Sequence, residues 1–184
     1  MTELESQKRS EFAWLAAMTV LVGAFLLFQV QPVISKIILP WFGGGPSVWT
    51  TCLLFFQVLL VAGYAYAHVL SRYVPIRRQA WVHGILVLLS LLTLPILPGE
   101  AWKPTDADFP MLRILFLLLV SVGVPYLLLS ATGPLVQTWF ARRYPQRSPY
   151  RLYALSNVGS LGALLTYPFL VEPALTTSQQ AYSW

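Results

Sequence analysis

Apolar residues occur in five long runs along the chain, separated by short segments rich in polar residues, proline and glycine. A helix needs about 20 apolar residues to cross the hydrocarbon core of a bilayer, and each run comes close to or exceeds this length. The pattern predicts spanning helices over residues 12–39, 47–70, 80–97, 110–140 and 151–171, with residues 178–184 opening a sixth. The fourth run would extend about 46 Å as a helix. We therefore expect it to tilt, to project from the membrane or to break near Gly133-Pro134.

Composition agrees with a membrane protein and excludes a soluble globular one. Hydrophobic residues make up 57% of the 184 residues and charged residues only 10%, and the mean hydropathy is +0.63. A soluble domain carries about 25% charged residues. We therefore predict an all-α integral membrane bundle in which residues 1–184 form a single domain. The net charge of +5 is no sign of a nucleic-acid partner, because in a membrane chain the position of each cation matters more than the sum.

The cations are distributed asymmetrically among the connecting segments. The N-terminal arm and the second and fourth loops hold most of the 12 lysines and arginines: Lys8, Arg9, Arg72, Arg77, Arg78, Arg142, Arg143, Arg147 and Arg151. The opposite side holds the acids Glu100, Asp106, Asp108 and Glu172. The positive-inside rule then places the N-terminus in the cytoplasm. The first apolar run is too long for a cleavable signal peptide, so we expect a multi-pass protein of a bacterial inner membrane.

The arginines of the two cytoplasmic loops are candidate contacts for anionic lipid headgroups, each worth about 1 kcal/mol. The seven are Arg72, Arg77, Arg78, Arg142, Arg143, Arg147 and Arg151. The alternative is that they set the topology and do nothing more.

The first and fourth runs share a local pattern. Gln31-Pro32-Val33-Ile34 corresponds to Gly133-Pro134-Leu135-Val136, and Pro46 corresponds to Pro149 at nearly the same offset. The two copies start on opposite sides of the membrane, as the 3+3 inverted repeats of transporter folds do. The alternative is that prolines near helix ends are common in membrane proteins.

Four polar residues within the predicted spans form the candidate intramembrane site: Gln29, Lys36, Gln57 and Asn157. Gln29 and Gln57 fall at similar depth on adjacent helices, so we expect their amides to meet, and Asn157 to bond Ser130 or Thr132. We expect Gln29, Lys36 and Gln57 to face the bundle interior, because a polar group in hydrocarbon is costly. The alternatives are helix–helix contacts for the amides and snorkelling to the outer interface for Lys36.

His68 and His83 flank the second loop almost symmetrically. Two histidines at one depth on antiparallel helices are able to ligate a haem or a pigment magnesium. Histidines at a membrane interface are more commonly hydrated or hydrogen-bonded, so we expect no cofactor.

Motifs of soluble enzymes are absent from the sequence. It contains no G-x-G-x-x-G after a strand, no P-loop, no H-E-x-x-H, no G-x-S-x-G and no paired cysteines. We therefore assign no catalytic residue and no metal ligand, and we expect no catalysis by this chain alone.

Three stretches carry a family resemblance: residues 28–36 (FQVQPVISK), 39–52 (LPWFGGGPSVWTTC) and 148–157 (SPYRLYALSN), with 167–173 (YPFLVEP) adding to it. They resemble bacterial membrane-embedded spermidine-synthase-like proteins. The resemblance covers nearly the whole chain and implies a membrane region like half of a major-facilitator transporter. In that family a Rossmann-type aminopropyltransferase-like domain often follows, and these 184 residues hold none of its strand–glycine-turn–helix units.

Three functions follow as hypotheses. The first is a non-catalytic membrane module that packs against or anchors other subunits of a membrane complex, or forms a homo-oligomer within the lipid bilayer. The second is a half-transporter for a small polar or charged solute. The third, which rests on the resemblance alone, is the membrane part of a spermidine-synthase-like enzyme.

Overall fold

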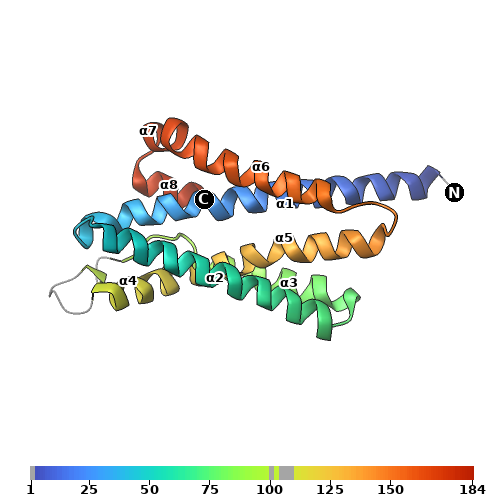
Figure 1. The fold of residues 1–184 in the computed structure, drawn as a ribbon, viewed down its shortest axis with the longest axis horizontal. Coiled ribbons are helices and arrows are strands. Elements are labelled where there is room, and N and C mark those ends of the chain that lie inside the picture. The colour runs from blue at the N-terminus through green and yellow to red at the C-terminus, as the bar shows by residue number, and fades with distance from the viewer. Residues whose placement is uncertain (1–2, 100–101, 104–109) are drawn as a thin grey trace.

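The computed structural model describes residues 3–99, 102–103 and 110–184, and all regular structure in these ranges is helical (Figure 1). Within these described ranges, four helices are long and apolar enough to cross a membrane: Ser10–Trp41, Pro46–Tyr73, Pro110–Arg143 and Tyr150–Ala174. The expectation of a helical membrane bundle is confirmed at this level. Its elements are α1 (Glu3–Ile38), α2 (Pro46–Tyr73), α3 (Ile76–Ser90), α4 (Pro110–Leu118), α5 (Val124–Arg143), α6 (Tyr150–Thr166), α7 (Glu172–Ala174) and α8 (Thr177–Ser183).

The turn between α1 and α2 has the form that its sequence predicts. A 3₁₀ turn at Leu39–Trp41 follows α1, and Gly43 and Gly44 then adopt φ values of 87° and 63°. A residue with a side chain is strained in this left-handed conformation, whereas glycine adopts it without strain. Pro46 begins α2, at a helix position where its missing N–H costs nothing.

The break in the long fourth run lies elsewhere than expected. Pro134 remains inside α5, whereas a π-helical segment at Leu119–Gly123 separates α4 from α5. The expected break at Gly133-Pro134 is therefore wrong. Pro125 lies two residues after the end of the π segment, and a proline has no N–H for the carbonyl one turn earlier, so the widened turn accommodates it. A second π segment, Tyr167–Val171, contains Pro168 and joins α6 to α7 in the same way.

The expected third span is the shortest of the set. α3 has 15 residues and ends in a 3₁₀ turn at Leu91–Thr93, ahead of Pro95 and Pro98. Fifteen helical residues rise about 23 Å, less than the hydrocarbon thickness of about 30 Å. A crossing by residues 80–97 therefore stays a prediction, whereas the other four expected spans coincide with the four long helices.

Helices from the two halves of the chain interlock. α1 packs on α6 and α5, α2 packs on α5 and α4, α3 lies on α5, and α8 lies on α1. Glycines allow the closest approaches: a Cβ at Gly63 would lie 2.8 Å from the Leu127 carbonyl oxygen of α5, and one at Gly159 would overlap the Leu21 carbonyl oxygen of α1. Small residues bring membrane helices together in this way.

Cationic segments gather at one end of the bundle. The N-terminal part of α1, the turn between α2 and α3 and the loop between α5 and α6 lie at the same end, and the α1–α2 turn lies at the other (Figure 1). We call these the basic end and the opposite end. Glu172 lies at the opposite end, and Glu100, Asp106 and Asp108 fall outside the described residues.

The last segment forms the helix expected from residue 178 onward. Thr176 caps α8 and shares a capping box with Gln179. The helix returns along α1, where the Trp184 indole N–H donates to the Leu26 carbonyl oxygen over 2.8 Å. This hydrogen bond holds the end of the chain against the middle of α1.

Candidate functional site

Gln29 and Gln57 do not meet. Gln29 is 6% exposed, and its Oε1 has no hydrogen-bond partner among the described residues. Gln57 is exposed, because the buried face of α2 runs through positions such as Phe56, Leu59 and Gly63. The expectation that Gln57 faces the interior and bonds Gln29 is therefore wrong.

A different amide joins α1 to a neighbouring helix. The Gln31 Nε2 donates to the Tyr126 hydroxyl of α5 over 3.2 Å. Tyr126 is 1% exposed and packs against Phe56 of α2, with ring centroids 5.0 Å apart and ring planes tilted by 51°. Gln31 belongs to the repeated proline pattern of the sequence. The polar residue predicted for the intramembrane site was Gln29, which lies two positions earlier.

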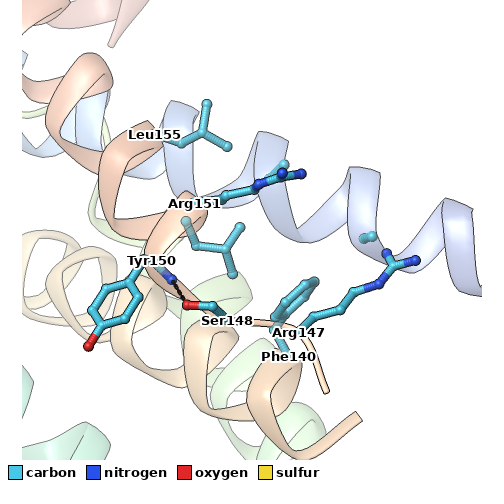
Figure 2. Close-up of a pocket in the computed structure, with 9 residues that line it drawn as sticks. Phe140, Arg147, Ser148, Tyr150, Arg151 and Leu155 are labelled. Atoms are coloured by element: carbon cyan, nitrogen blue, oxygen red, sulfur yellow. Dashed lines mark hydrogen bonds between the residues drawn. The ribbon is translucent and has the colours of Figure 1, made fainter. Parts of the chain in front are cut away.

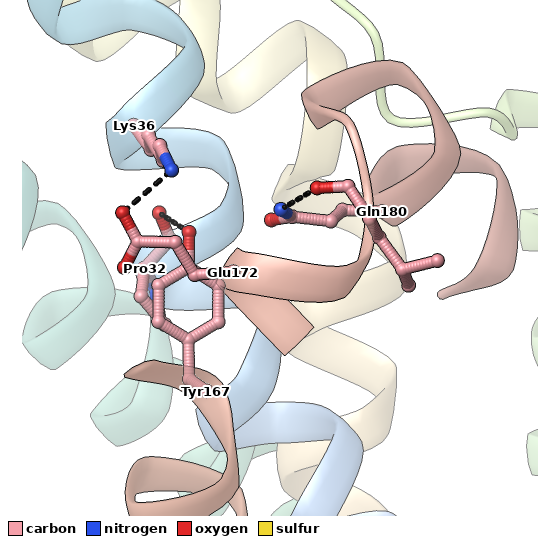
Figure 3. A network of polar contacts seen from close by, with 6 residues as sticks. Pro32, Lys36, Tyr167, Glu172 and Gln180 are labelled. Carbon is pink, nitrogen blue, oxygen red and sulfur yellow. Dashed lines mark hydrogen bonds and ion pairs between the residues drawn. The ribbon is translucent and has the colours of Figure 1, made fainter. Parts of the chain in front are cut away.

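Lys36 has a carboxylate partner near the opposite end of the bundle. Its Nζ lies 2.6 Å from Oε1 of Glu172 on α7, and both side chains are partly exposed (Figure 3). One turn away, the Tyr167 hydroxyl donates to the Pro32 carbonyl oxygen over 3.5 Å. These contacts tie α1 to the α6–α7 segment. Sequence reasoning placed both charges on one side of the membrane but did not pair them.

A polar cavity of about 390 Å³ lies between α1, α2, α5 and α6. Seven side chains with hydroxyl or amide groups line it, and it holds no charged side chain. They are Tyr64, Ser130, Gln137, Tyr153, Ser156, Asn157 and Ser160. Apolar parts of α1, including Val20, Ala24 and Leu27, form the opposite wall. We call this space the central cavity.

Asn157 is the one predicted site residue that reaches the central cavity. Its expected hydrogen bond to Ser130 or Thr132 is not formed. The Ser130 hydroxyl donates to the Leu127 carbonyl oxygen of its own helix over 2.7 Å, and Thr132 contacts His83 instead. Four polar residues of α6 recur at helical spacing: Tyr153, Ser156, Asn157 and Ser160. This spacing places them on one face of the helix, and it is the sequence signal that identifies this wall of the cavity.

His83 joins α3 to two neighbouring helices through polar contacts. It is 5% exposed, with Nε2 3.0 Å from Thr132 Oγ1 on α5 and Nδ1 3.4 Å from the Tyr66 hydroxyl on α2. His68 is exposed, so the two histidines do not face each other. The paired-ligand interpretation for a haem or pigment is therefore wrong, since hydrogen bonds occupy both nitrogens of His83.

The seven loop arginines divide into different environments, all at the basic end. Arg142 donates to the Ser71 carbonyl oxygen over 3.2 Å, and Arg72 lies 5.8 Å from the ring centroid of Tyr73. Arg77, Arg78 and Arg143 are exposed.

Arg147 and Arg151 differ from the other five, because both line one open cavity of about 720 Å³ between α1, α5 and α6 (Figure 2). We call it the basic cavity.

Comparison with known proteins adds no relative. No protein-family model, no curated protein and no solved structure matches the chain. The resemblance to spermidine-synthase-like membrane proteins therefore stays a prediction.

Proposed function

We propose that this chain is a half-transporter unit that binds a small, polar, uncharged solute in the central cavity. One observation carries the proposal: four long apolar helices border an open space lined by seven hydroxyl- or amide-bearing side chains. Ligand sites typically occupy about 300–1,000 Å³, and the central cavity lies at the low end of that range. Hydroxyl and amide groups match a solute that both donates and accepts hydrogen bonds, such as a small polyol.

The order of helix packing supports an inverted repeat. If α1, α2 and α3 form one half and α4–α5, α6 and α8 the other, a two-fold axis in the membrane plane exchanges equivalent helices. The exchange turns the α1–α6 pair into the α5–α2 pair, and the α3–α5 pair into the α8–α1 pair. All four of these pairs are in contact. The central cavity lies at the junction of the two halves, where transporters of this architecture place their solute.

Thiol labelling tests whether the central cavity holds water. In a Cys52→Ala background, Asn157→Cys places a thiol in the cavity, and Val158→Cys places one at nearly the same depth on an exposed face of α6. Only an ionised thiol reacts quickly, and ionisation requires water. We expect a membrane-impermeant maleimide to modify position 157 at least about tenfold faster than position 158. Equal and slow rates at both positions would contradict the proposal.

Solute flux completes the test. Proteoliposomes that contain the wild-type chain should swell faster in glycerol or erythritol than empty liposomes do. Asn157→Leu should remove the increase, because the solute loses an amide partner. Gly162→Ala is the matched control on the same helix, since residue 162 does not line the cavity and a Cβ there meets only Phe25 Cδ2, at 3.9 Å. Equal swelling with and without the protein would contradict transport even if the cavity proves aqueous.

A second candidate function, docking of a second copy of the chain, has its own observation. Thr50, Gln57, Tyr64 and Ser71 follow one another at intervals of seven on α2, so they form one stripe, and the first three are exposed. An amide such as that of Gln57 facing lipid is costly, and a second copy would cover it. Gln57→Cys in the Cys52→Ala background should form a disulfide-linked dimer, whereas Val58→Cys, which is 57% exposed but lies about 100° around the helix, should not. Failure of both variants to cross-link would contradict this candidate.

A further inference from the structure

The basic cavity combines two kinds of surface. Arg147 and Ser148 come from the loop before α6, and Arg151 comes from the first turn of α6. Figure 2 shows both guanidinium groups extending from this segment toward the ribbon of α1. Its other walls are apolar, made by Ala13 and Ala17 of α1, Phe140 of α5, and Leu152 and Leu155 of α6. The cavity is therefore cationic at its edge and apolar along its length.

The charge at this edge is not neutralised by the described part of the chain. Among the side chains that the structure describes, no carboxylate lines the cavity, and the one ion pair joins Lys36 to Glu172 at the opposite end. Glu11 lies two residues before Ala13 on α1, and its carboxylate accepts from Gln7 over 3.3 Å rather than from either arginine. Arg147 lies over the ring of Tyr144, 5.4 Å from its centroid, and a cation–π contact of this kind uses none of the guanidinium N–H donors.

The hydroxyl of Ser148 adds a third donor. Its Oγ accepts from the backbone N–H of Tyr150 over 3.3 Å, so the hydroxyl hydrogen points elsewhere (Figure 2). Two guanidinium forks and one hydroxyl suit the oxygens of a phosphate, which guanidinium groups bind through paired hydrogen bonds.

The apolar walls decide which phosphate fits. Ala13 and Ala17 are four apart on α1, so the two smallest side chains of the lining share one face and open the space beside α6. A free phosphate ion gains nothing from such walls, whereas an acyl chain buries apolar surface against them. We propose that the basic cavity binds an anionic phospholipid, with its phosphate held by Arg147, Ser148 and Arg151 and its acyl chain lying along Ala13, Ala17 and Leu155.

Lipid retention in native mass spectrometry tests the proposal on the whole purified chain. The probe is phosphatidylglycerol, compared with phosphatidylcholine. Two guanidinium groups account for about a 30-fold preference for the anionic lipid. Arg147→Gln with Arg151→Gln should lower phosphatidylglycerol affinity by about this factor. Arg77→Gln with Arg78→Gln removes the same charge from the first turn of α3, also at the basic end, where neither side chain lines the basic cavity, and should change the affinity by less than about twofold.

A second variant tests the apolar wall without changing charge. Ala17→Phe should fill the cavity and weaken retention about tenfold, and Ala13→Leu serves if the larger side chain prevents folding. Soluble glycerol phosphate in excess should not displace the lipid. The proposal is overturned if the two arginine pairs lower affinity equally, if neither alanine variant has an effect, or if glycerol phosphate displaces the lipid. The last outcome would assign the arginines to a soluble phosphate compound.

Discussion

The helices α1 and α6 approach each other closely at Gly159 because glycine has no side chain. A methyl group added at this position should push the two helices apart. A Cβ at Gly159 would overlap the Leu21 carbonyl oxygen and lie 3.3 Å from the Ala24 Cβ. Backbone atoms of α1 are unable to move aside without shifting the whole helix. Gly162, one turn later on the same helix, offers the matched control. A Cβ there meets only Phe25 Cδ2, at an ordinary distance of 3.9 Å.

The two Gly→Ala substitutions make the same helix-propensity contribution to the free energy of unfolding, and they differ in this clash. Replacing a mid-helix glycine with alanine stabilises a helix by roughly 0.5–1 kcal/mol. That gain applies to both positions, so it cancels when the two variants are compared. Overpacking costs about 1–3 kcal/mol. We therefore expect the free energy of unfolding to be about 1–3 kcal/mol lower for Gly159→Ala than for Gly162→Ala, with Gly162→Ala at or above the wild type.

Equilibrium unfolding in mixed micelles measures this difference. Dodecylmaltoside micelles titrated with dodecyl sulfate unfold helical membrane proteins, and tryptophan fluorescence reports the transition. Purified wild type, Gly159→Ala and Gly162→Ala should give transitions in the order Gly162→Ala, wild type, Gly159→Ala from most to least stable. Equal stability of the two variants would refute the close approach of α1 and α6 at Gly159.

Two further predictions concern polar contacts. Gln79 is fully buried, donates to the Val74 carbonyl oxygen over 2.7 Å and accepts from the Trp139 indole over 2.8 Å. Gln79→Leu should therefore lower the free energy of unfolding by about 2–3 kcal/mol in the same titration, and no loss would show that these groups find other partners. The Lys36–Glu172 pair is about 40% exposed at both side chains, so a double-mutant cycle with Lys36→Met and Glu172→Gln should give a coupling energy of at most about 1 kcal/mol. A coupling above about 2 kcal/mol would show that the pair is shielded from solvent.

Local sequence signals predicted the parts of the fold that depend on local chemistry. Helix ends follow proline and glycine, as at Pro40 and Gly43, and the length of each apolar run sets the span. The clustering of cationic segments at one end follows from the alternation of spans. The π segment before Pro125 was missed because two prolines in one run, at 125 and 134, are locally equivalent. Which of them interrupts the helix depends on the helices packed around it.

The prediction for Gln57 failed for a different reason, which is the rotation of α2 about its own axis. In a soluble helix the apolar stripe shows which face is buried, but in a membrane both the lipid-facing and the buried faces are apolar. The four candidate residues were therefore chosen by polarity alone. Polarity shows that a side chain is costly to place in hydrocarbon, but it does not show whether the helix orients that side chain toward lipid or toward the bundle.

Small residues indicate which face of a membrane helix packs against its neighbour, which hydropathy alone does not. Gly63 and Gly159 mark the buried faces of α2 and α6, because each lies against the backbone of its neighbour. At 100° per residue, Gln57 lies about 120° around the helix from Gly63, and Asn157 lies about 160° from Gly159. Both amides therefore turn away from the tightest contact of their helix, as the structure has them. The glycines therefore exclude both amides from the tightest helix–helix contacts. The neighbouring helices then decide whether such a residue lines a cavity, as Asn157 does, or lies on the outer surface, as Gln57 does.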